Sequence, residues 1–422
     1  MTWEEGRMRR SMTLLALVSA GALTGCTAVK SVRTAGSATF GDDVAFARKS
    51  TLVVVLSGSE GRAAVAVAPK LQGRVLTSTS SGQGGMSFGW INRALLAEGR
   101  PRPQINCYGG EDRFWIGPEG GQFSIFFSKG ASFDMAHWFT PAPIDTEAFD
   151  VVSSSAAKIV MKKDMQLTNY AGTTFKLKVD REVRVIDTSE ACQLLGLENA
   201  EGLETVGFES ANTMTNTGDV AWDKATGLLS IWILGMFQPG TVTSVAIPFT
   251  PGPDEELGPK VNDAYFGKVP EERLSVTDGA VVFVADGKCR SKIGVSPRRA
   301  KSVLGSYDAL NGVLTIVQYN KPEGKTDYVN SLWQEQENPY GGDAVNAYND
   351  GPASPGAKPL GPFYEMETSS PAAALQPGES IQHIHRTFHF TGPEPVLNAI
   401  AMKALGVSVP RMMSVYTKVY AK

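Results

Sequence analysis

The feature that most constrains the fold is an alternation of apolar and charged residues along positions 174–187. Most odd-numbered positions from Phe175 to Val185 are apolar, whereas the even-numbered positions from Lys176 to Arg184 are charged. Successive side chains of a β-strand point to opposite faces, so a period of two predicts a strand with one buried and one solvated face. The rest of the chain must therefore supply strands that pair with it.

Shorter runs of β-prone residues recur along the chain, and helical patterns are few. One short helix is expected over 189–195, with Ser189 as its N-cap, and a longer helix over 394–405. The 44 glycines and 24 prolines suit many turns. These patterns predict an all-β fold, an antiparallel β-sandwich in a single domain over 46–422. Further strands are expected over 52–56, 63–68, 74–78, 123–127, 159–161, 228–236, 242–249, 280–285, 313–319, 363–368 and 380–391.

The charge balance excludes one class of partner. The net charge is −3, whereas a protein that binds nucleic acid needs a basic face to displace phosphate counterions. We therefore expect no nucleic-acid partner, and we expect a monomer. No apolar run reaches the roughly 18 residues of a membrane-spanning helix.

The N-terminus has the pattern of an export signal. Two arginines, Arg9 and Arg10, precede a short apolar run, and the segment Leu-Thr-Gly-Cys follows, ending at Cys26. That tetrapeptide resembles the lipobox of bacterial lipoproteins, in which the cysteine is lipidated and residues 1–25 are removed. Residues 26–45 are rich in small residues and are expected to form a tether. Because Thr27 follows the cysteine, the outer membrane or the periplasmic face of the cell envelope is favoured.

Three of the four histidines lie within seven residues: His383, His385 and His389. On a strand these share one face, as do Glu365 and Glu367 on the strand before them. If the two strands pair, acids and imidazoles meet on one surface that could carry out acid–base chemistry. Glu367, His385 and His383 are then the candidate catalytic residues. A divalent metal at His383 and His385 is an alternative, as is a plain solvated strand face; no other cofactor is expected.

A second group of polar and aromatic residues follows a Gly-Gly turn at 109–110. Carboxylates and guanidinium groups hydrogen-bond sugar hydroxyls, and an indole covers the apolar face of a sugar ring. A surface turn with a buried tryptophan is the other interpretation. The Gly/Pro/Asn-rich stretch 338–362 is expected to be a long loop, either functional or simply exposed. The candidate substrate-binding residues are Tyr108, Glu111, Asp112, Arg113, Trp115, Glu365, His389, Asn346 and Tyr348.

Several of these segments together resemble the galactose-mutarotase (aldose 1-epimerase) superfamily, and within it an uncharacterised family of bacterial lipoproteins. The resemblance rests on residues 108–121, on Thr-Asn-Thr-Gly at 215–218, and on Glu-Met-Glu-Thr at 365–368 followed by Leu-Gln-Pro-Gly-Glu at 375–379. It implies a large β-supersandwich that handles carbohydrate, and it places Glu367 at the position of the family's catalytic base.

The chain also departs from that family pattern. Tyr108 stands where mutarotases have a substrate-positioning histidine, and Thr217 stands where they have the catalytic acid. A threonine hydroxyl does not titrate in the range that general acid catalysis needs. His383 or His385 is therefore the expected replacement acid. Two functions remain open: an epimerase, lyase or hydrolase acting on carbohydrate, and a non-catalytic glycan-binding or structural lipoprotein of the envelope.

Overall fold

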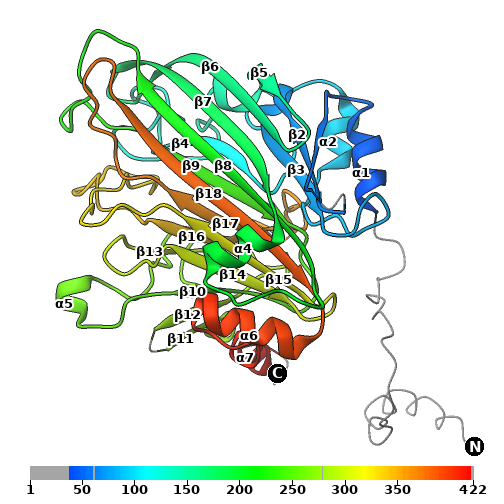
Figure 1. Cartoon of the computed structure of the whole chain (residues 1–422). Helices are drawn as coiled ribbons and strands as arrows, with labels where there is room; N and C mark the ends of the chain where they lie inside the picture. The colour runs from blue at the N-terminus through cyan, green and yellow to red at the C-terminus, as the bar shows by residue number, and fades with distance from the viewer. Residues whose placement is uncertain (1–37, 60–61, 278, 355, 420–422) are drawn as a thin grey trace, which may run out of the picture. The chain divides into compact units, whose positions relative to one another are not determined.

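The computed structural model describes residues 38–59, 62–277, 279–354 and 356–419. Their dominant feature is a pair of antiparallel sheets, one of ten strands and one of five, that pack face to face around a shared core (Figure 1). A third, three-stranded sheet packs against α1 and α2. The large antiparallel β-sandwich with a few short helices that the sequence predicts is thereby confirmed.

The order of strands shows that neighbours in space are often distant in sequence. The ten-stranded sheet runs β11 (Leu274–Thr277), β12 (Ala280–Val284), β10 (Thr243–Pro248), β14 (Val303–Asp308), β15 (Val313–Tyr319), β18 (Ser380–Thr391), β8 (Glu204–Asn216), β7 (Thr174–Ile186), β6 (Lys158–Thr168) and β5 (Asp150–Ser154). The five-stranded sheet runs β13 (Ser291–Val295), β16 (Val345–Asn349), β17 (Tyr364–Ser369), β9 (Ser230–Phe237) and β4 (Arg113–Gly117). The three-stranded sheet runs β1 (Val54–Ser57), β2 (Ala64–Ala68) and β3 (Arg74–Thr79).

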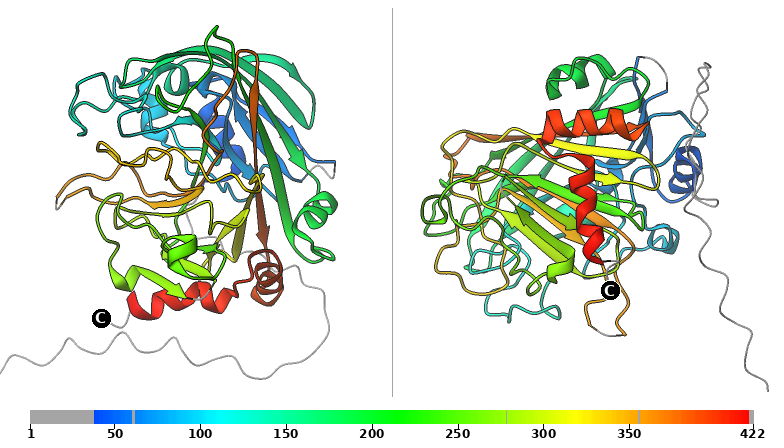
Figure 2. Two further views of the ribbon diagram at one scale, coloured as in Figure 1. Left: turned by 90° about the vertical axis from the view of Figure 1, so that its left-hand side faces the viewer. Right: turned by 90° about the horizontal axis from the view of Figure 1, so that it is seen from below.

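Helices cover part of the outer face of the ten-stranded sheet. Apolar residues of α4, α6 and α7 pack against outward-facing residues of β14, β15 and β18, and Figure 2 shows α6 and α7 in orange-red and red near the C-terminus. No helix in the described part of the chain is both apolar enough and long enough for a bilayer crossing. The helices are α1 (Phe40–Ala47), α2 (Arg93–Glu98), α3 (Ala142–Asp145), α4 (Thr188–Leu195), α5 (Asp254–Leu257), α6 (Glu394–Leu405) and α7 (Val409–Val419), with short 3-10 turns at Pro69–Leu71 and Glu271–Arg273.

Four expectations about the elements need correction. The tether predicted over 26–45 overlaps α1, because Thr39 caps this helix with a capping box and Phe40 is buried. The run 123–127 is a loop, in which the Ser124 hydroxyl accepts a hydrogen bond from the Phe126 amide. The long loop 338–362 is interrupted by β16. Helix α4 has Asp187 rather than Ser189 at its N-cap. The proposed signal peptide and Cys26 lie outside the described residues.

The alternation along β7 works as predicted, with one informative exception. Its odd-numbered side chains are buried, and they include Arg181 at the break in the apolar pattern. Arg181 donates to Asp112 at 2.5 Å, and both side chains are fully buried. The space between the sheets therefore contains ionised and polar groups as well as apolar ones.

Candidate functional site

The outer face of the five-stranded sheet, which points away from the ten-stranded sheet, forms the floor of a cleft. Strand parity selects its residues: Arg113 and Trp115 of β4, Trp232 and Met236 of β9, and Glu365 of β17 line the cavity. The residues between them face the core, as Phe114, Ile233 and Met366 do. The pairing register aligns the floor residues, since Glu365 lies opposite Met236 on one side and Tyr348 on the other.

Glu365 is the acidic group that the floor presents to the cleft. It is buried and accepts a hydrogen bond from Arg113 Nη2 at 3.0 Å, and the Arg113 guanidinium stacks over Trp115 at 4.2 Å. Burial raises the pKa of Glu365 well above its usual range, and the negative charge of Glu367 raises it further. Arg113 and Lys292 only partly oppose that rise. Glu365 therefore tends to hold a proton near neutral pH.

Glu367 lies deeper, with no exposed surface, beneath Lys292 and Trp232. Its Oε2 accepts hydrogen bonds from Lys292 Nζ and from Trp232 Nε1, both at 2.9 Å, while its Oε1 has no partner. Burial lowers the pKa of Lys292, but the charges of Glu367 and Glu119 outweigh this, so that the pKa is raised overall. Lys292 therefore keeps its positive charge beside Glu367 across the neutral range.

Aromatic side chains form the walls of the cleft. The rings of Trp115 and Trp232 lie edge to face at 5.6 Å, and Trp138 stacks on Trp333 at 5.8 Å. The cleft has two parts. The inner part, the floor pocket, encloses about 90 Å³, and the outer part, the outer hollow, encloses about 410 Å³. The two parts adjoin, as shown by Lys292 and Trp333, which line both. Cavities of roughly 300–1,000 Å³ are typical of small-molecule sites. The residues that line both parts are Glu119, Met135, Phe266, Arg290, Lys292, Trp333 and Leu360.

This arrangement can bind a ring with apolar faces and exchange a proton with it. The indole faces suit the apolar side of such a ring, and the Glu365 and Arg113 groups suit its hydroxyls. Two neighbouring carboxyl groups held in different environments form an acid–base pair. Cys107 also lines the floor, but burial raises the pKa of its thiol to about 12, so that it carries no nucleophilic thiolate at neutral pH.

The three histidines do share a face, as predicted, but that face is not in the cleft. β17 pairs with β16 and β9, whereas β18 pairs with β15 and β8, so that the two strands belong to different sheets. His383 and His385 point between the sheets and are buried. The predicted convergence of Glu367 with His383 and His385 is therefore wrong, and neither histidine can act as the acid for a ligand in the cleft.

Thr368 shows how the two sheets meet. Its hydroxyl lies 2.8 Å from His383 Nε2 and 2.9 Å from His385 Nδ1, and it is on the opposite face of β17 from Glu367. Burial lowers the pKa of His383 to about 3 and of His385 to about 4, so both rings are neutral in the fold. The hydroxyl occupies the nitrogens that a metal would need, and no group of three or more metal-binding side chains occurs among the described residues.

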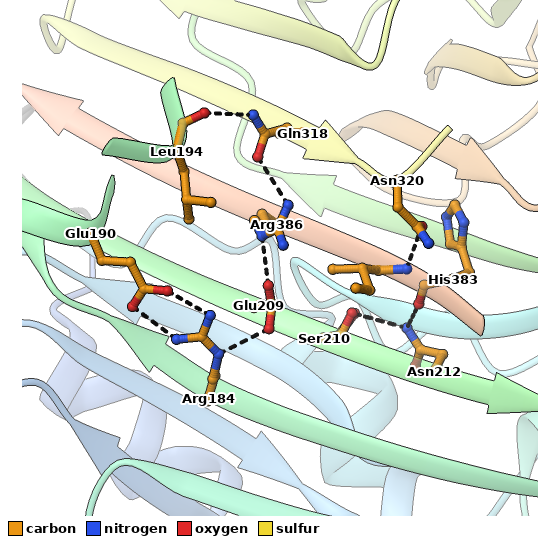
Figure 3. A network of polar contacts seen from close by, with 11 residues as sticks. Arg184, Glu190, Leu194, Glu209, Ser210, Asn212, Gln318, Asn320, His383 and Arg386 are labelled. Atoms are coloured by element: carbon orange, nitrogen blue, oxygen red, sulfur yellow. Dashed lines mark hydrogen bonds and ion pairs between the residues drawn. The ribbon is translucent and has the colours of Figure 1, made fainter. Parts of the chain in front are cut away.

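The outward face of β18, opposite the face that carries the histidines, stabilises the fold (Figure 3). Arg386 donates to Glu209 at 2.6 Å and to Gln318 at 3.1 Å, and Gln318 donates to the carbonyl of Leu194 at the end of α4. Arg184 links Glu209 to Glu190 in α4. This network holds α4 against the ten-stranded sheet.

Other predicted site residues also lie away from the cleft. Tyr108 is buried in the cluster around the three-stranded sheet, with Arg74 5.8 Å from its ring. Glu111 and His389 form a buried pair at 2.7 Å between the sheets. Asp112 pairs with Arg181 there. None of these four residues lines the cleft. Arg113 and Trp115 do line it, although they are near neighbours in sequence of three of the four.

Asn346 and Tyr348 do contribute to the cleft region, but from β16 rather than from a loop. Asn346 donates to the Tyr265 hydroxyl at 3.1 Å, and Tyr348 lines the floor pocket. The sequence analysis missed the main cation and most of the aromatic wall. The continuous apolar run around Trp232, expected as a strand over 228–236, was a usable signal, whereas nothing local distinguishes Lys292 or the loop residues. The missed residues are Glu119, Trp138, Trp232, Tyr265, Phe266, Arg290, Lys292 and Trp333.

Fold and site together define an antiparallel β-sandwich protein with an aromatic cleft that has paired carboxyl groups at its floor. The chain belongs to a family of unknown function (DUF6786), whose model matches residues 38–416. No curated protein matches the sequence.

Solved structures with a similar course of the chain carry names from the group that the sequence resembles. One is a proposed aldose 1-epimerase from Escherichia coli K12, 12% identical, covering 80% of this chain and 99% of that chain with a TM-score of 0.48. Another is a galactose mutarotase-like protein from Lactobacillus casei ATCC 334 (11% identity, 80% and 100% coverage, TM-score 0.43). A third is a galactose mutarotase related enzyme from Lactobacillus acidophilus (9% identity, 81% and 98% coverage, TM-score 0.44).

Proposed function

We propose that the protein recognises carbohydrate in the cleft on the five-stranded sheet. The observation that carries this proposal is the combination of indole walls with a hydrogen-bonding floor, in which Arg113 and Glu365 lie directly beside Trp115. A saccharide ring presents both apolar faces and hydroxyl edges, and the cleft offers a partner to each.

Acid–base chemistry on the bound sugar is the finer form of the proposal. Glu365 is the group that meets the ligand and transfers a proton, while Glu367, held by Lys292, favours the protonated form of Glu365. Glu365 and Glu367 lie two positions apart on one face of β17, and Glu367 is enclosed by Lys292 and Trp232. Epimerisation, elimination and glycoside hydrolysis each use such a proton-transferring group, and the product formed identifies which of them occurs.

Non-catalytic glycan binding is the second candidate. It is favoured by the absence of any histidine from the described residues that line the cleft, and by the ion pairs that occupy Glu367 and Arg113. We further propose that the protein is an envelope lipoprotein anchored through Cys26 and acts as a monomer; the tetrapeptide that ends at Cys26 supports the anchor.

A panel of monosaccharides and glycans tests the proposal, with binding followed by tryptophan fluorescence and products followed by NMR. Four tryptophans line the cleft, so a bound sugar should change the emission. We expect Trp333→Ala to weaken binding at least tenfold, since an aromatic anchor is lost. The matched control is Phe139→Ala, which removes an exposed aromatic ring that does not line the cleft.

Glu365→Gln separates catalysis from binding. If the protein is an enzyme, this variant should bind the sugar but form no product, because the amide cannot deliver a proton. Binding by the wild type without any product identifies a binding protein. Failure of every saccharide to bind, or equal binding by Trp333→Ala, rules out the cleft as a carbohydrate site.

A further inference from the structure

A second cavity lies on the other side of the five-stranded sheet, and we propose that it binds a small organic ammonium ion. The cavity encloses about 240 Å³ where β9 and β18 end and β15 and β17 begin. None of its described lining residues also lines the cleft.

Strand parity separates the two cavities. Phe237 and Tyr364 point into the second cavity, whereas their neighbours Met236 and Glu365 line the cleft. A ligand that enters one cavity therefore meets none of the side chains of the other, and each can be tested alone.

Aromatic rings form one wall of the second cavity. His389 stacks on Phe88 with 4.1 Å between ring centroids and meets Phe237 edge to face at 5.9 Å, while Phe237 lies 5.5 Å from Tyr364. Both nitrogens of His389 are occupied, by Thr315 at 2.9 Å and by Glu111 at 2.7 Å. The histidine therefore contributes a ring rather than a free donor or acceptor.

The charge of the cavity is negative. Asp308 is the carboxylate that lines it, and none of its described lining residues is a lysine or an arginine. Among the described residues, the Asp308 carboxylate accepts hydrogen bonds from neutral donors: the amides of Leu310 and Asn311, at 3.0 and 3.4 Å, and the Asn311 side chain at 2.6 Å. Burial raises the pKa of Asp308, as expected for a carboxyl group that lacks a cationic partner.

Gly240 leaves room for this carboxylate. A Cβ at position 240 would lie 2.5 Å from Asp308 Oδ1 and 2.8 Å from its Cγ and Oδ2. An alanine there would have to displace the carboxylate, which offers a way to disturb the site without removing the charge.

A carboxylate facing aromatic rings is the chemistry that binds organic cations. The ring faces attract an ammonium group through their quadrupoles, and the carboxylate supplies the opposite charge. The volume equals that of about eight waters of liquid, at roughly 30 Å³ each, which suits a small amine and excludes a peptide or an oligosaccharide.

Isothermal titration calorimetry of the purified full-length protein tests the proposal with three probes. These are choline, ethanolamine and 3,3-dimethylbutan-1-ol (dimethylbutanol), in which an uncharged carbon replaces the nitrogen of choline. We expect at least one ammonium probe to bind with a dissociation constant in the millimolar range or below, and at least tenfold more tightly than dimethylbutanol. Equal binding of the uncharged analogue, or binding of neither ammonium probe, overturns the proposal, and this comparison needs no variant.

Two variants locate the site. Asp308→Asn and Gly240→Ala should each weaken ammonium binding at least tenfold, with folding checked by circular dichroism. Asp350→Asn is the matched control, because Asp350 lines the outer hollow of the cleft instead. Equal loss of binding in Asp350→Asn, or unchanged binding in a folded Asp308→Asn, would show that the ammonium ion does not bind in this cavity.

Discussion

At the residue scale, Glu365 and Glu367 lie two positions apart on one strand face and yet have different surroundings. Glu367 is enclosed, with Lys292 and Trp232 on one oxygen, whereas Glu365 borders the cavity beside Arg113. Glu367, which is enclosed, therefore acts as the counter-charge of Lys292, whereas Glu365 is positioned to reach a ligand in the cavity. The resemblance to mutarotases implies that Glu367 is the base, whereas Glu365 is the carboxyl group of the two that lines the cavity and would contact a ligand there.

A double-mutant cycle tests the enclosed pair. Glu367→Leu leaves the Lys292 ammonium buried without its partner, so we expect the free energy of unfolding to fall by about 3–5 kcal/mol. Replacing both residues, Glu367→Leu with Lys292→Met, should cost less than the sum of the two single substitutions. Denaturant unfolding followed by circular dichroism measures all four proteins.

Lys358→Met is the control for that cycle, because Lys358 is exposed at the rim. It should change the free energy of unfolding by no more than about 0.5 kcal/mol. Strict additivity of the two single losses would mean that Lys292 and Glu367 do not interact in solution.

At the element scale, β18 carries neutral histidines in the interior of the sandwich. Their pKa values, lowered by burial to about 3 for His383 and about 4 for His385, are far below the usual value near 6.5. Repulsion from His385 adds to the effect on His383, while Asp112 opposes it in both. Between about pH 4 and pH 6 these two rings therefore bind up to about two more protons in the unfolded chain than in the folded chain.

This difference predicts how stability depends on pH. The contribution of the two histidines is complete above pH 6.5 and is lost as the pH falls towards 4, by up to about 1.4 kcal/mol per pH unit for each ring. We expect His383→Gln/His385→Gln to flatten the fall in unfolding free energy between pH 7 and pH 5. His137→Gln should not, since His137 is exposed. An unchanged slope in the double variant would refute the assignment.

The two strands also show what could be predicted from sequence. The bounds of β15, β18 and α6 are those expected, because their patterns are long and their ends carry turn residues. Parity correctly grouped Glu365 with Glu367 on one face and the three histidines on another. Parity within one strand does not reveal its partners, however, and residues of β17 and β18 pair with residues up to 187 positions away, as Thr391 does with Glu204. The sequence analysis assumed that β17 and β18 pair with each other, and the wrong expectation that Glu367 meets His383 and His385 followed from that assumption.

At the scale of the whole molecule, the cleft gathers residues that are scattered along the chain. Arg113, Trp232, Lys292 and Glu365 come from four strands of one sheet, and loop residues such as Trp138 and Trp333 complete the walls. Only the arrangement of strands brings them together, so no local pattern could have identified Lys292. Charged and aromatic residues at strand positions of suitable parity were the available signal.

The proposed membrane anchor is also a property of the whole molecule. If Cys26 is lipidated, the chain should incorporate a fatty-acid label in bacterial cells and fractionate with membranes. Cys26→Ser should abolish the labelling and shift the protein out of the membrane fraction. Cys107→Ser is the control, because Cys107 is buried in the fold and should leave both readouts unchanged. Labelling that persists in Cys26→Ser would eliminate the anchor.

Because the two faces of β17 line different parts of the molecule, the length of this segment cannot change freely. Its alternate residues serve two separate compartments: Glu365 and Glu367 on one side, and Met366 and Thr368 on the other. Loss or gain of a single amino acid before Glu365 would exchange the two sets, pushing acids towards the imidazoles and a methionine into the cleft. Point substitutions in β17 alter one compartment, whereas a one-residue insertion or deletion damages both at once.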